Sequence, residues 1–591
     1  MKQFFTVMMS VVICSLLTQT VFSQETTSQI VGSVTDGKNP LSGATVTVTN
    51  TSTGTTTSTT TRRDGRFNVP NLRVGGPYTV VITFVGFSEG KQQNINLLLG
   101  QESKADFALS LSSANLEGVV VSAARQEKVI NKNRTGSQEI ISRTQIERLP
   151  TINRSLGDFT RLTPSASGFN IGGRNGFLNN VSVDGANLTN TFGLGSSPAL
   201  GSQTNSQPIS LDAIEQIQVN VSPYDVRQGG FSGAGINSVT KSGTNQFKAT
   251  VYTYLRSPDV QGYHVRTITL PKQDYSYNMR GASVGGPIIK NKLFFFLSGE
   301  QERLKLPGTS FVAADATHQP GGNVSQAKAD TLNALSKFLV DTYKYDPGVY
   351  QGYTYNTQSD KVTAKLDFNV NEHNTLTLKY NYLKSFRQIQ PSNSGSINSV
   401  SGRTPGVTAM PFFGAGYTQN NNFNIVIAEL NTRLGNSASN KLQVGYSALR
   451  DFRGILSNSV FPLVDILDGS GNPFTSFGHE QYSANNLLST DIYQLSDIFS
   501  LFQGTHELTF GTQNYFKKYK NGFSPAYEGV YRYNSLADFY TSARGGTLPS
   551  ARYDISYSFS KDGSFPFATP SVFELGVFAQ DKWRIKPNLT L

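Results

Sequence analysis

The fold of this chain is decided by residues 360–382, which read DKVTAKLDFNVNEHNTLTLKYNY. Apolar and polar residues alternate on both sides of the turn at 371–374, so each half has one apolar face and one face that carries charges. This period of two predicts a β-hairpin. In a soluble sandwich the apolar face would be the core, whereas in a membrane barrel it faces lipid and the polar face lines the interior.

The connections between such segments distinguish the two architectures. The candidate strands after Phe247 are 247–256, 276–285, 292–302, 360–370, 375–385, 423–433, 441–450, 489–500, 505–516 and 572–584. Short connections (286–291, 371–374, 434–440, 501–504) alternate with long ones (257–275, 303–359, 386–422, 451–488, 517–571). This alternation is typical of outer-membrane barrels, and closure would satisfy the backbone polar groups in lipid. Thr590-Leu591 reads as the start of a further strand, so we expect a large barrel that is cut in its middle.

Composition excludes several other classes. The 591 residues carry a net charge of +11, but Lys and Arg are scattered without a polybasic tract, so we expect no nucleic-acid partner. The five histidines lack the spacing of a zinc motif, and no nucleophile–base pair can be placed, so we expect neither an enzyme nor a cofactor. The glycines 230, 233 and 235 do not form a nucleotide fingerprint.

The N-terminus predicts export. Lys2 precedes a mainly apolar stretch, and Ser23 is a small residue at a plausible cleavage site, so residues 1–23 read as a signal peptide. The single cysteine, Cys14, lies within this signal, which excludes disulfides and thiolate metal sites from the mature chain.

Four further regions follow from local pattern. Residues 24–112 contain short strand candidates separated by turns, which favours a β-sandwich, with the threonine-rich stretch 49–61 as an edge strand or loop. A linker (113–133) holds one valine-rich strand, and residues 134–245 have mixed α and β character, with helical spacing at 140–162 broken by Pro150. Residues 326–343 predict an amphipathic helix within a long loop, with Leu332, Leu335, Leu339 and Val340 on one side.

Several of these segments resemble known families. Residues 32–36, 40–46 and 64–67 (GSVTD, PLSGATV and DGRF) resemble the carboxypeptidase regulatory-like domain. The order of signal, this domain, valine-rich box, plug and barrel is similar to the SusC/Oar-like branch of TonB-dependent receptors. The motifs that carry this second resemblance are Gly172-Gly-Arg174, Val183-Asp-Gly185, 214–219, 233–245 and 578–583.

The resemblance implies a fold and a set of sites. The fold would be mainly β, with an N-terminal sandwich, a mixed α/β plug at 134–245 and the first part of a large antiparallel transmembrane barrel at 246–591. The residues that match the TonB box are Glu117, Gly118, Val119, Val120, Val121 and Ser122. The residues that match the plug motif are Gly172, Gly173, Arg174, Asp184 and Gly185. Arg174 and Asp184 would pair with the barrel wall, or they would be a solvated arginine and a turn-stabilising aspartate.

The resemblance also implies a function. TonB, with ExbB and ExbD, would add to the valine-rich strand by β-augmentation and deliver energy from the inner membrane. The expected function is import of a bulky solute, an oligosaccharide or peptide, through the outer membrane, with the N-terminal domain and plug on the periplasmic side. A SusD-like lipoprotein is a possible partner. Two alternatives stay open: an outer-membrane adhesion or assembly protein of the Oar-like type, and a soluble carbohydrate-binding β protein.

Overall fold

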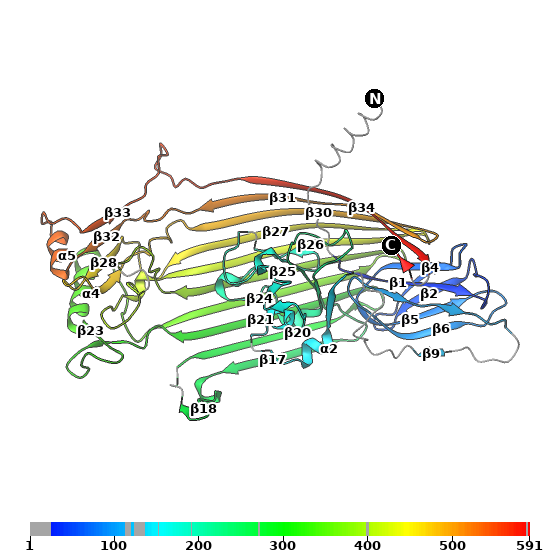
Figure 1. The fold of residues 1–591 in the computed structure, drawn as a ribbon, viewed down its shortest axis with the longest axis horizontal. Coiled ribbons are helices and arrows are strands. Elements are labelled where there is room, and N and C mark those ends of the chain that lie inside the picture. The colour runs from blue at the N-terminus through cyan, green and yellow to red at the C-terminus, as the bar shows by residue number, and fades with distance from the viewer. Residues whose placement is uncertain are drawn as a thin grey trace.

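The computed structural model describes residues 25–112, 120–122, 136–586 except 152, 191, 270–271, 273 and 398–400, and 589–591. Three units follow one another along the chain (Figure 1). An N-terminal domain (25–112) and an inner domain (136–245) precede a large sheet that begins at Lys248. The expected mainly β fold class is confirmed. The expected signal peptide lies outside the described residues.

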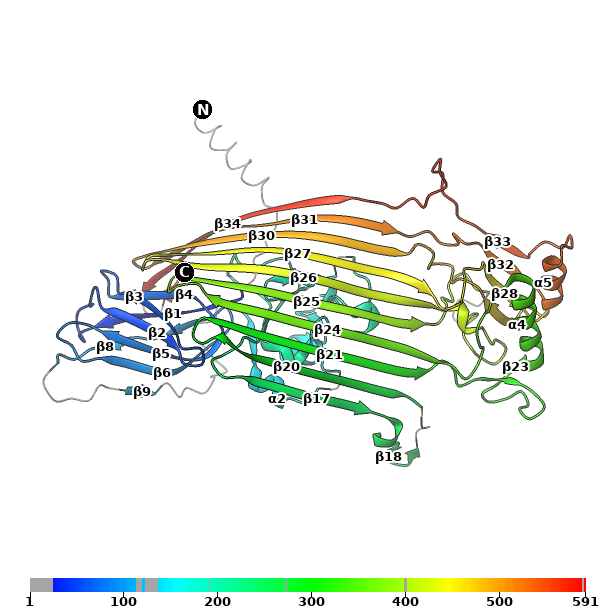
Figure 2. The ribbon, with the colours of Figure 1, turned by 180° about the vertical axis from the view of Figure 1, so that it is seen from behind.

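The large sheet has eleven antiparallel strands, each paired with the next strand of the sheet along the chain. Its strands are β17 (Lys248–Arg256), β20 (Ser276–Ile289), β21 (Leu293–Pro307), β24 (Thr354–Asn369), β25 (Asn374–Ile389), β26 (Tyr417–Leu434), β27 (Ala438–Ile455), β30 (Leu487–Gln503), β31 (His506–Gly522), β34 (Ser571–Lys586) and β35 (Leu589–Thr590). The inner domain lies against one face, in front of the strands in Figure 1 and behind them in Figure 2. Among the described residues, no ladder joins β17 to β35.

The strands are longer than the sequence pattern predicts. All candidate strands coincide with strands of the sheet, but β26 and β27 have 18 residues each, against the roughly ten expected of a membrane strand. Most of the additional residues lie toward the long loops, and in β26 they include Asn420–Asn422. Main-chain pairing continues there without an apolar face, because it does not depend on side-chain polarity, so the alternation that marks the strands disappears before the strands end.

The two faces of the sheet settle which environment it occupies. Lys365 and Asp367 are 9% and 1% exposed, whereas the intervening Leu366 is 40% exposed. Leu378 on the partner strand is 43% exposed, and its neighbour Lys379 is buried. A soluble sandwich would bury the leucines, so the observed orientation is that of a membrane barrel with charges turned into its interior.

The two ends of the sheet differ. Tight connections at 290–292, 370–373, 435–437 and 504–505 form a short-turn end, where the N-terminal domain lies (Figure 1). The opposite long-loop end carries β18 (His264–Val265), β19 (Ile268–Thr269), β22 (Val312–Ala314), β23 (Val324–Lys328), α4 (Ala329–Tyr343), β28 (Leu463–Leu467), β29 (Pro473–Phe477), β32 (Val530–Tyr533), α5 (Leu536–Ala543) and β33 (Arg552–Asp554). The amphipathic helix is confirmed as α4, with Leu332, Leu335 and Leu339 buried, but Val340 is 41% exposed and does not share their face.

The N-terminal domain consists of two sheets packed around an apolar core. One sheet has the order β4-β1-β7, with β8 also on β1, and the other has the order β3-β2-β5-β6-β9. The strands are β1 (Ser28–Thr35), β2 (Thr45–Asn50), β3 (Thr55–Thr60), β4 (Arg66–Leu72), β5 (Gly75–Thr83), β6 (Gly90–Leu97), β7 (Glu102–Lys104), β8 (Phe107–Ala108) and β9 (Val120–Ser122). The threonine-rich stretch forms the edge strand β3, as predicted.

The inner domain has a sheet of order β10-β15-β16-β13-β14 and two short helices. Its elements are β10 (Gln138–Ser142), α2 (Arg143–Arg148), α3 (Leu156–Thr160), β11 (Ala166–Ser167), β12 (Asn170–Ile171), β13 (Asn180–Val183), β14 (Ala186–Asn187), β15 (Ile214–Asn220) and β16 (Gly235–Thr240). Helical spacing from residue 140 was therefore the wrong prediction for the start of this region. Ile140 and Ile141 pair with β15, and a helix begins only after Ser142, whose backbone N–H donates to the Gln145 side chain at 2.9 Å.

Part of the contact between the inner domain and the large sheet is apolar. Ile217 and Val219 of the inner domain belong to one buried cluster with Phe423, Ile425 and Ile427 of β26. This cluster places the inner domain against the interior face of the sheet. In the part of the chain that the structure describes, no helix has the length and apolar character to cross a membrane.

The outward orientation of Leu378 gives a first prediction. Leu378→Arg places a charge in the lipid-facing band, and we expect it to cost about 2–4 kcal/mol of folding free energy. Leu434→Arg, at an exposed position beside a short turn, should cost about 1 kcal/mol or less, since the cost falls toward the interface. Urea titration of protein refolded into lipid vesicles measures both. Equal effects of the two variants would contradict the orientation.

Candidate functional site

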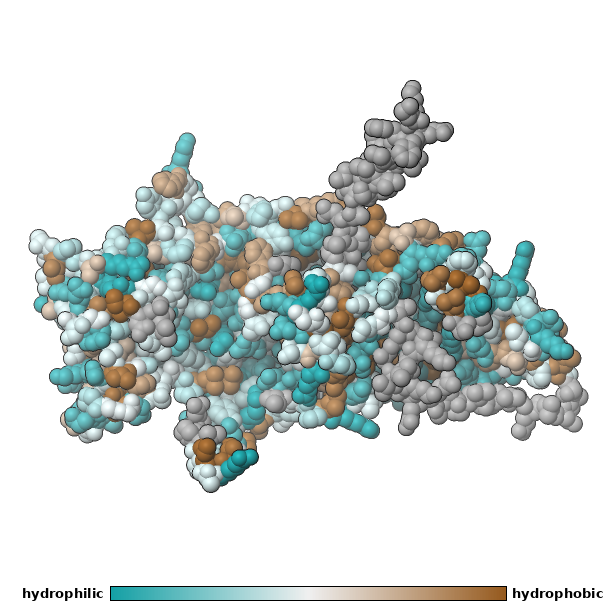
Figure 3. All heavy atoms as spheres, viewed as in Figure 1, coloured by the Kyte–Doolittle hydropathy of each residue, from teal (hydrophilic) through white to brown (hydrophobic). Residues whose placement is uncertain are grey.

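The candidate site is the polar surface between the inner domain and the wall formed by the large sheet. Charges buried there require partners, because an unpaired buried charge costs several kcal/mol. Seen from the side of the inner domain, hydrophilic residues cover much of the hollow beside that domain (Figure 3). The contacts that satisfy the buried charges therefore determine how the two units are held together.

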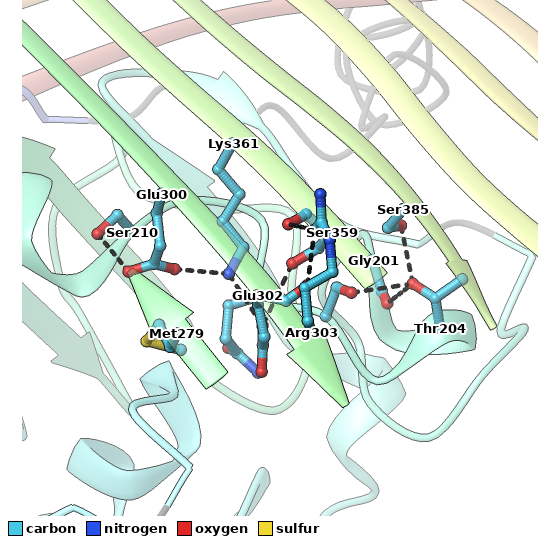
Figure 4. Close-up of polar contacts among 12 residues, drawn as sticks. Gly201, Thr204, Ser210, Met279, Glu300, Glu302, Arg303, Ser359, Lys361 and Ser385 are labelled. Carbon is cyan, nitrogen blue, oxygen red and sulfur yellow. Dashed lines mark hydrogen bonds and ion pairs between the residues drawn. The ribbon is translucent and has the colours of Figure 1, made fainter. Parts of the chain in front are cut away.

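The first contact joins the inner domain to β21. Ser210, which immediately precedes a short helical turn of the inner domain, donates from Oγ to Glu300 Oε2 at 2.8 Å (Figure 4). Tyr252 of β17 donates to the same oxygen at 2.6 Å. Lys361 Nζ of β24 donates to the other oxygen, Glu300 Oε1, at 2.7 Å. One carboxylate thus connects the inner domain with three strands of the wall.

Lys361 extends this network to a second carboxylate. Its ammonium lies 3.3 Å from Glu302 Oε2, and Ser359 donates to the same oxygen at 3.2 Å. Tyr277 donates to Glu302 Oε1 at 2.9 Å. The side chain of Lys361 is only 2% exposed, so two carboxylates share this single buried ammonium.

A second contact is made by the turn Val183-Asp184-Gly185. Asp184 and Gly185 have φ angles of 53° and 82°, the left-handed conformation that a two-residue hairpin turn of this hand requires, and glycine adopts it without steric cost. The Asp184 carboxylate accepts from the backbone N–H of Thr240 at 3.0 Å and lies 3.8 Å from Lys365 Nζ. The Asp184 carboxylate thus joins the turn to β16 and faces a cation of the wall.

The backbone of this turn makes more contacts with the wall than its carboxylate does. Lys379 Nζ donates to Asp184 O at 3.2 Å, and Gln443 donates to the same oxygen at 3.3 Å. Gln494 donates to Gly185 O at 2.9 Å. Three strands of the sheet therefore bind one hairpin through its main-chain carbonyl groups. A residue of any type would supply such a group at these two positions.

The other half of the plug motif behaves differently. Gly172 and Gly173 form a turn with φ angles of 63° and 73°, and Arg174 follows with an exposed side chain. In the part of the chain that the structure describes, no side-chain hydrogen bond or ion pair of Arg174 to the wall occurs. The solvated-arginine interpretation fits this position.

Two further wall contacts involve residues that the sequence did not single out. Thr204 Oγ1 lies 2.8 Å from Ser385 Oγ of β25 (Figure 4), and Arg154 donates to Tyr254 Oη of β17 at 2.8 Å. The guanidinium of Arg154 also lies 4.3 Å from the centre of the Tyr254 ring, a cation–π distance. The one available signal was the polar face of the strands, which identifies inward residues but not their partners.

The valine-rich strand is only partly described. Val120–Ser122 form β9, which pairs in parallel with β6, Lys91 opposite Val120 and Gln93 opposite Ser122. Glu117, Gly118 and Val119 lie outside the described residues. In the sheet order β3-β2-β5-β6-β9, this strand stands at the end.

A cavity of about 210 Å³ lies where the three units meet. The N-terminal domain contributes Thr55 and Arg73, the inner domain contributes Asp184 and Lys241, and the wall contributes Lys379 and Glu429 among others. Both charge signs line it, so it is a polar chamber toward the short-turn end.

The geometry first defines a class of protein: a membrane β-barrel with a separate domain held against its interior wall. Residues 239–591 match the family described as Outer membrane beta barrel domain, which is more than half of the chain, and the chain belongs to this family. Residues 29–110 match the Carboxypeptidase regulatory-like domain.

Similar proteins agree with this class. The TonB-dependent transporter Oar of Myxococcus xanthus is 25% identical over 413 residues, which are 66% of this chain and 36% of that protein. The probable TonB-dependent siderophore receptor PirA of Acinetobacter baumannii is 25% identical over 32% of this chain and 25% of its own length. The chain thus spans 36% and 25% of the length of these two relatives. The outer membrane transporter YddB of Escherichia coli has a similar fold, with a TM-score of 0.50 and 14% identity over 76% of this chain and 55% of that one.

The shared ammonium of Lys361 gives a second prediction. Lys361→Met leaves Glu300 and Glu302 without their cation, and breaking a buried pair in this way costs about 3–5 kcal/mol. We expect amide hydrogen exchange in β15 to accelerate by roughly a hundredfold, because the inner domain loses its connection to the wall. Lys272→Met removes the exposed pair with Asp259 and should change exchange by less than about threefold. An unchanged exchange rate in the Lys361 variant would show that this network does not hold the domain.

Proposed function

We propose that this protein imports a bulky solute through the outer membrane, with the inner domain acting as a plug that is displaced by energy from the inner membrane. The observation that carries the proposal is the polar interface between the inner domain and the wall. Hydrogen bonds such as Ser210–Glu300 and Gln494–Gly185 can be exchanged for bonds to water when a path opens. We expect the inner domain and the short turns to lie on the periplasmic side of the membrane.

The proposed energy source is TonB, together with ExbB and ExbD. Strand β9 supports this part of the proposal, because it already adds to a sheet through its main chain and its outer edge pairs with no strand among the described residues. A further strand can pair with such an edge largely independently of side chains. TonB would add there, and traction would pass along the linker to the inner domain.

The proposed substrate is an oligosaccharide or a peptide. An oligosaccharide or peptide would need a wide path and side chains that bind flat or extended solutes, and exposed aromatic residues such as Tyr557 and Phe559, which are 68% and 92% exposed, lie among the long loops. A ferric siderophore is the second candidate, since one similar protein is named a probable siderophore receptor. A SusD-like lipoprotein is proposed as a lid at the long-loop end.

The alternative function is adhesion or assembly at the outer membrane without import. It differs from the leading proposal in one requirement, because only import needs traction on the strand at 117–122. A soluble carbohydrate-binding protein disagrees with the outward leucines of the sheet.

The third prediction separates import from adhesion. Deleting Glu117–Ser122 should abolish both binding of the purified TonB C-terminal domain and uptake of whichever probe the intact protein accumulates from a panel of fluorescent malto-oligosaccharides, peptides and one ferric siderophore. Surface labelling of the long loops should persist.

The matched controls distinguish main-chain from side-chain recognition. Val121→Pro removes a backbone N–H and fixes φ, so it should weaken TonB binding at least tenfold, whereas Val121→Thr should change it less than about threefold. TonB binding that survives the deletion would contradict the proposed handle, and uptake that survives it would favour a passive role.

A further inference from the structure

The N-terminal domain is seated across the short-turn end of the wall, where it touches several strands. Asn71 Nδ2 donates to Asn440 O of β27 at 3.3 Å, and Thr26 Oγ1 donates to Glu429 Oε2 of β26 at 2.9 Å. The other contacts on this side are Thr55 with Asn369 (2.8 Å), Thr60 with Asn436 (3.1 Å) and Arg62 with Asn436 O (3.4 Å). The domain therefore follows the rim rather than hanging from a single linker (Figure 1).

Two ion-pair clusters fix the domain at separated positions of the rim. Arg73 lies 3.6 Å from Asp367 of β24. At the other position, Glu102 Oε1 accepts from Lys582 Nζ at 2.6 Å and from Arg584 at 2.7 Å, both of β34. Between β24 and β34 lie five other strands of the sheet. The attachments thus span much of the described wall.

The Glu102 cluster is a charged contact that depends on docking. Burial by itself raises the pKa of Glu102, but the ammonium of Lys582 and the guanidinium of Arg584 outweigh it and hold the pKa below its ordinary value. The carboxylate is thus ionised while its side chain is only 11% exposed. Separation of the domain would expose Glu102, Lys582 and Arg584 to water, and Arg584 would keep Glu507 of the wall, 3.5 Å away, as a partner.

The same domain also covers the inner domain. Glu25 pairs with Arg227 at 2.7 Å, and the side-chain amide of Gln216 donates to Leu97 O at 3.0 Å and accepts from Leu99 N–H at 2.9 Å. Asn245 N–H donates to Ser52 O at 2.9 Å. The polar chamber of about 210 Å³ lies between these contacts, with Thr53, Thr55 and Thr57 of the N-terminal domain in its lining.

We propose that the N-terminal β-sandwich is a second, detachable closure at the short-turn end, which must leave the rim before a solute can pass from the chamber. Two features support it: the domain covers both the wall and the inner domain, and the contacts described above are hydrogen bonds and ion pairs. Such contacts separate into water at little cost, whereas an apolar interface of the same extent would not.

One consequence rests on the proposed function. Strand β9 is hydrogen-bonded to β6 of this same domain. A force applied to β9 would therefore act on the β-sandwich as well as on the linker to the inner domain. The closure at the short-turn end would then open in the same pull that displaces the plug.

The fourth prediction tests the closure without TonB and without a solute. Cys14 is the only cysteine of the sequence and lies within the expected signal peptide, so Ser283→Cys supplies a single reporter thiol. Ser283 lines the chamber and is 7% exposed. Glu102→Lys combined with Arg73→Glu sets like charges against each other at both clusters, and we expect the rate of labelling by a maleimide-polyethylene glycol in isolated outer membranes to rise at least tenfold.

The controls separate undocking from misfolding. Adding Lys582→Glu, Arg584→Glu and Asp367→Lys restores opposite charges and should return the labelling rate to within about threefold of the parent. Lys272→Glu, in a remote exposed pair, should leave it unchanged, and heat-modifiable gel mobility should report a folded barrel in every variant. An unchanged rate in the reversed variant, or a rise that the restoring charges do not correct, overturns the closure. Neither result bears on TonB binding to residues 117–122.

Discussion

The structure depends on one constraint: a sheet that crosses lipid must turn its apolar side chains outward, and its polar side chains are thereby driven into the interior. Leu366 and Leu378 face outward, and Lys361, Lys365 and Lys379 face inward. Cations in a confined interior need carboxylates or carbonyl groups close by. The wall's own Glu300 supplies one for Lys361, and the inner domain supplies the Asp184 carboxylate for Lys365 and the Asp184 carbonyl for Lys379. The inward charges of the wall therefore also form part of the binding surface for the inner domain.

The interface between the inner domain and the wall has an apolar part and a polar part. An apolar cluster around Ile217 and Phe423 buries surface between the inner domain and the wall. Polar groups such as Ser210 and the Asp184 carbonyl fix the position of the inner domain on the wall. The contact through main-chain carbonyls of the Val183-Asp184-Gly185 turn is independent of side-chain identity. Wall residues can therefore bind the turn through its carbonyl groups, while Asp184 and Gly185 suit the left-handed backbone conformation of the turn.

The N-terminal domain repeats the principle at the rim. Its apolar core is formed by its own residues, whereas the contacts with the wall and the inner domain described above are hydrogen bonds and ion pairs. A domain with its own core can leave an interface without unfolding. This separation of internal stability from attachment makes it suited to a removable part.

The sequence by itself determined the strands and their surroundings. The alternation in 360–382 and the short and long connections identified a membrane barrel, because lipid and water impose opposite polarities on the two faces of every strand. The amphipathic α4, the edge strand at 55–60 and the turn at Asp184 followed from equally local patterns. Only the tertiary structure decided which inward charge meets which partner, since Ser210 and Glu300 are 90 positions apart and their meeting depends on how the inner domain sits within the wall. It also decided that Ile140 and Ile141 form a strand, because β15 lies beside them, and that Glu102 reaches Lys582, because the sandwich rests on the rim.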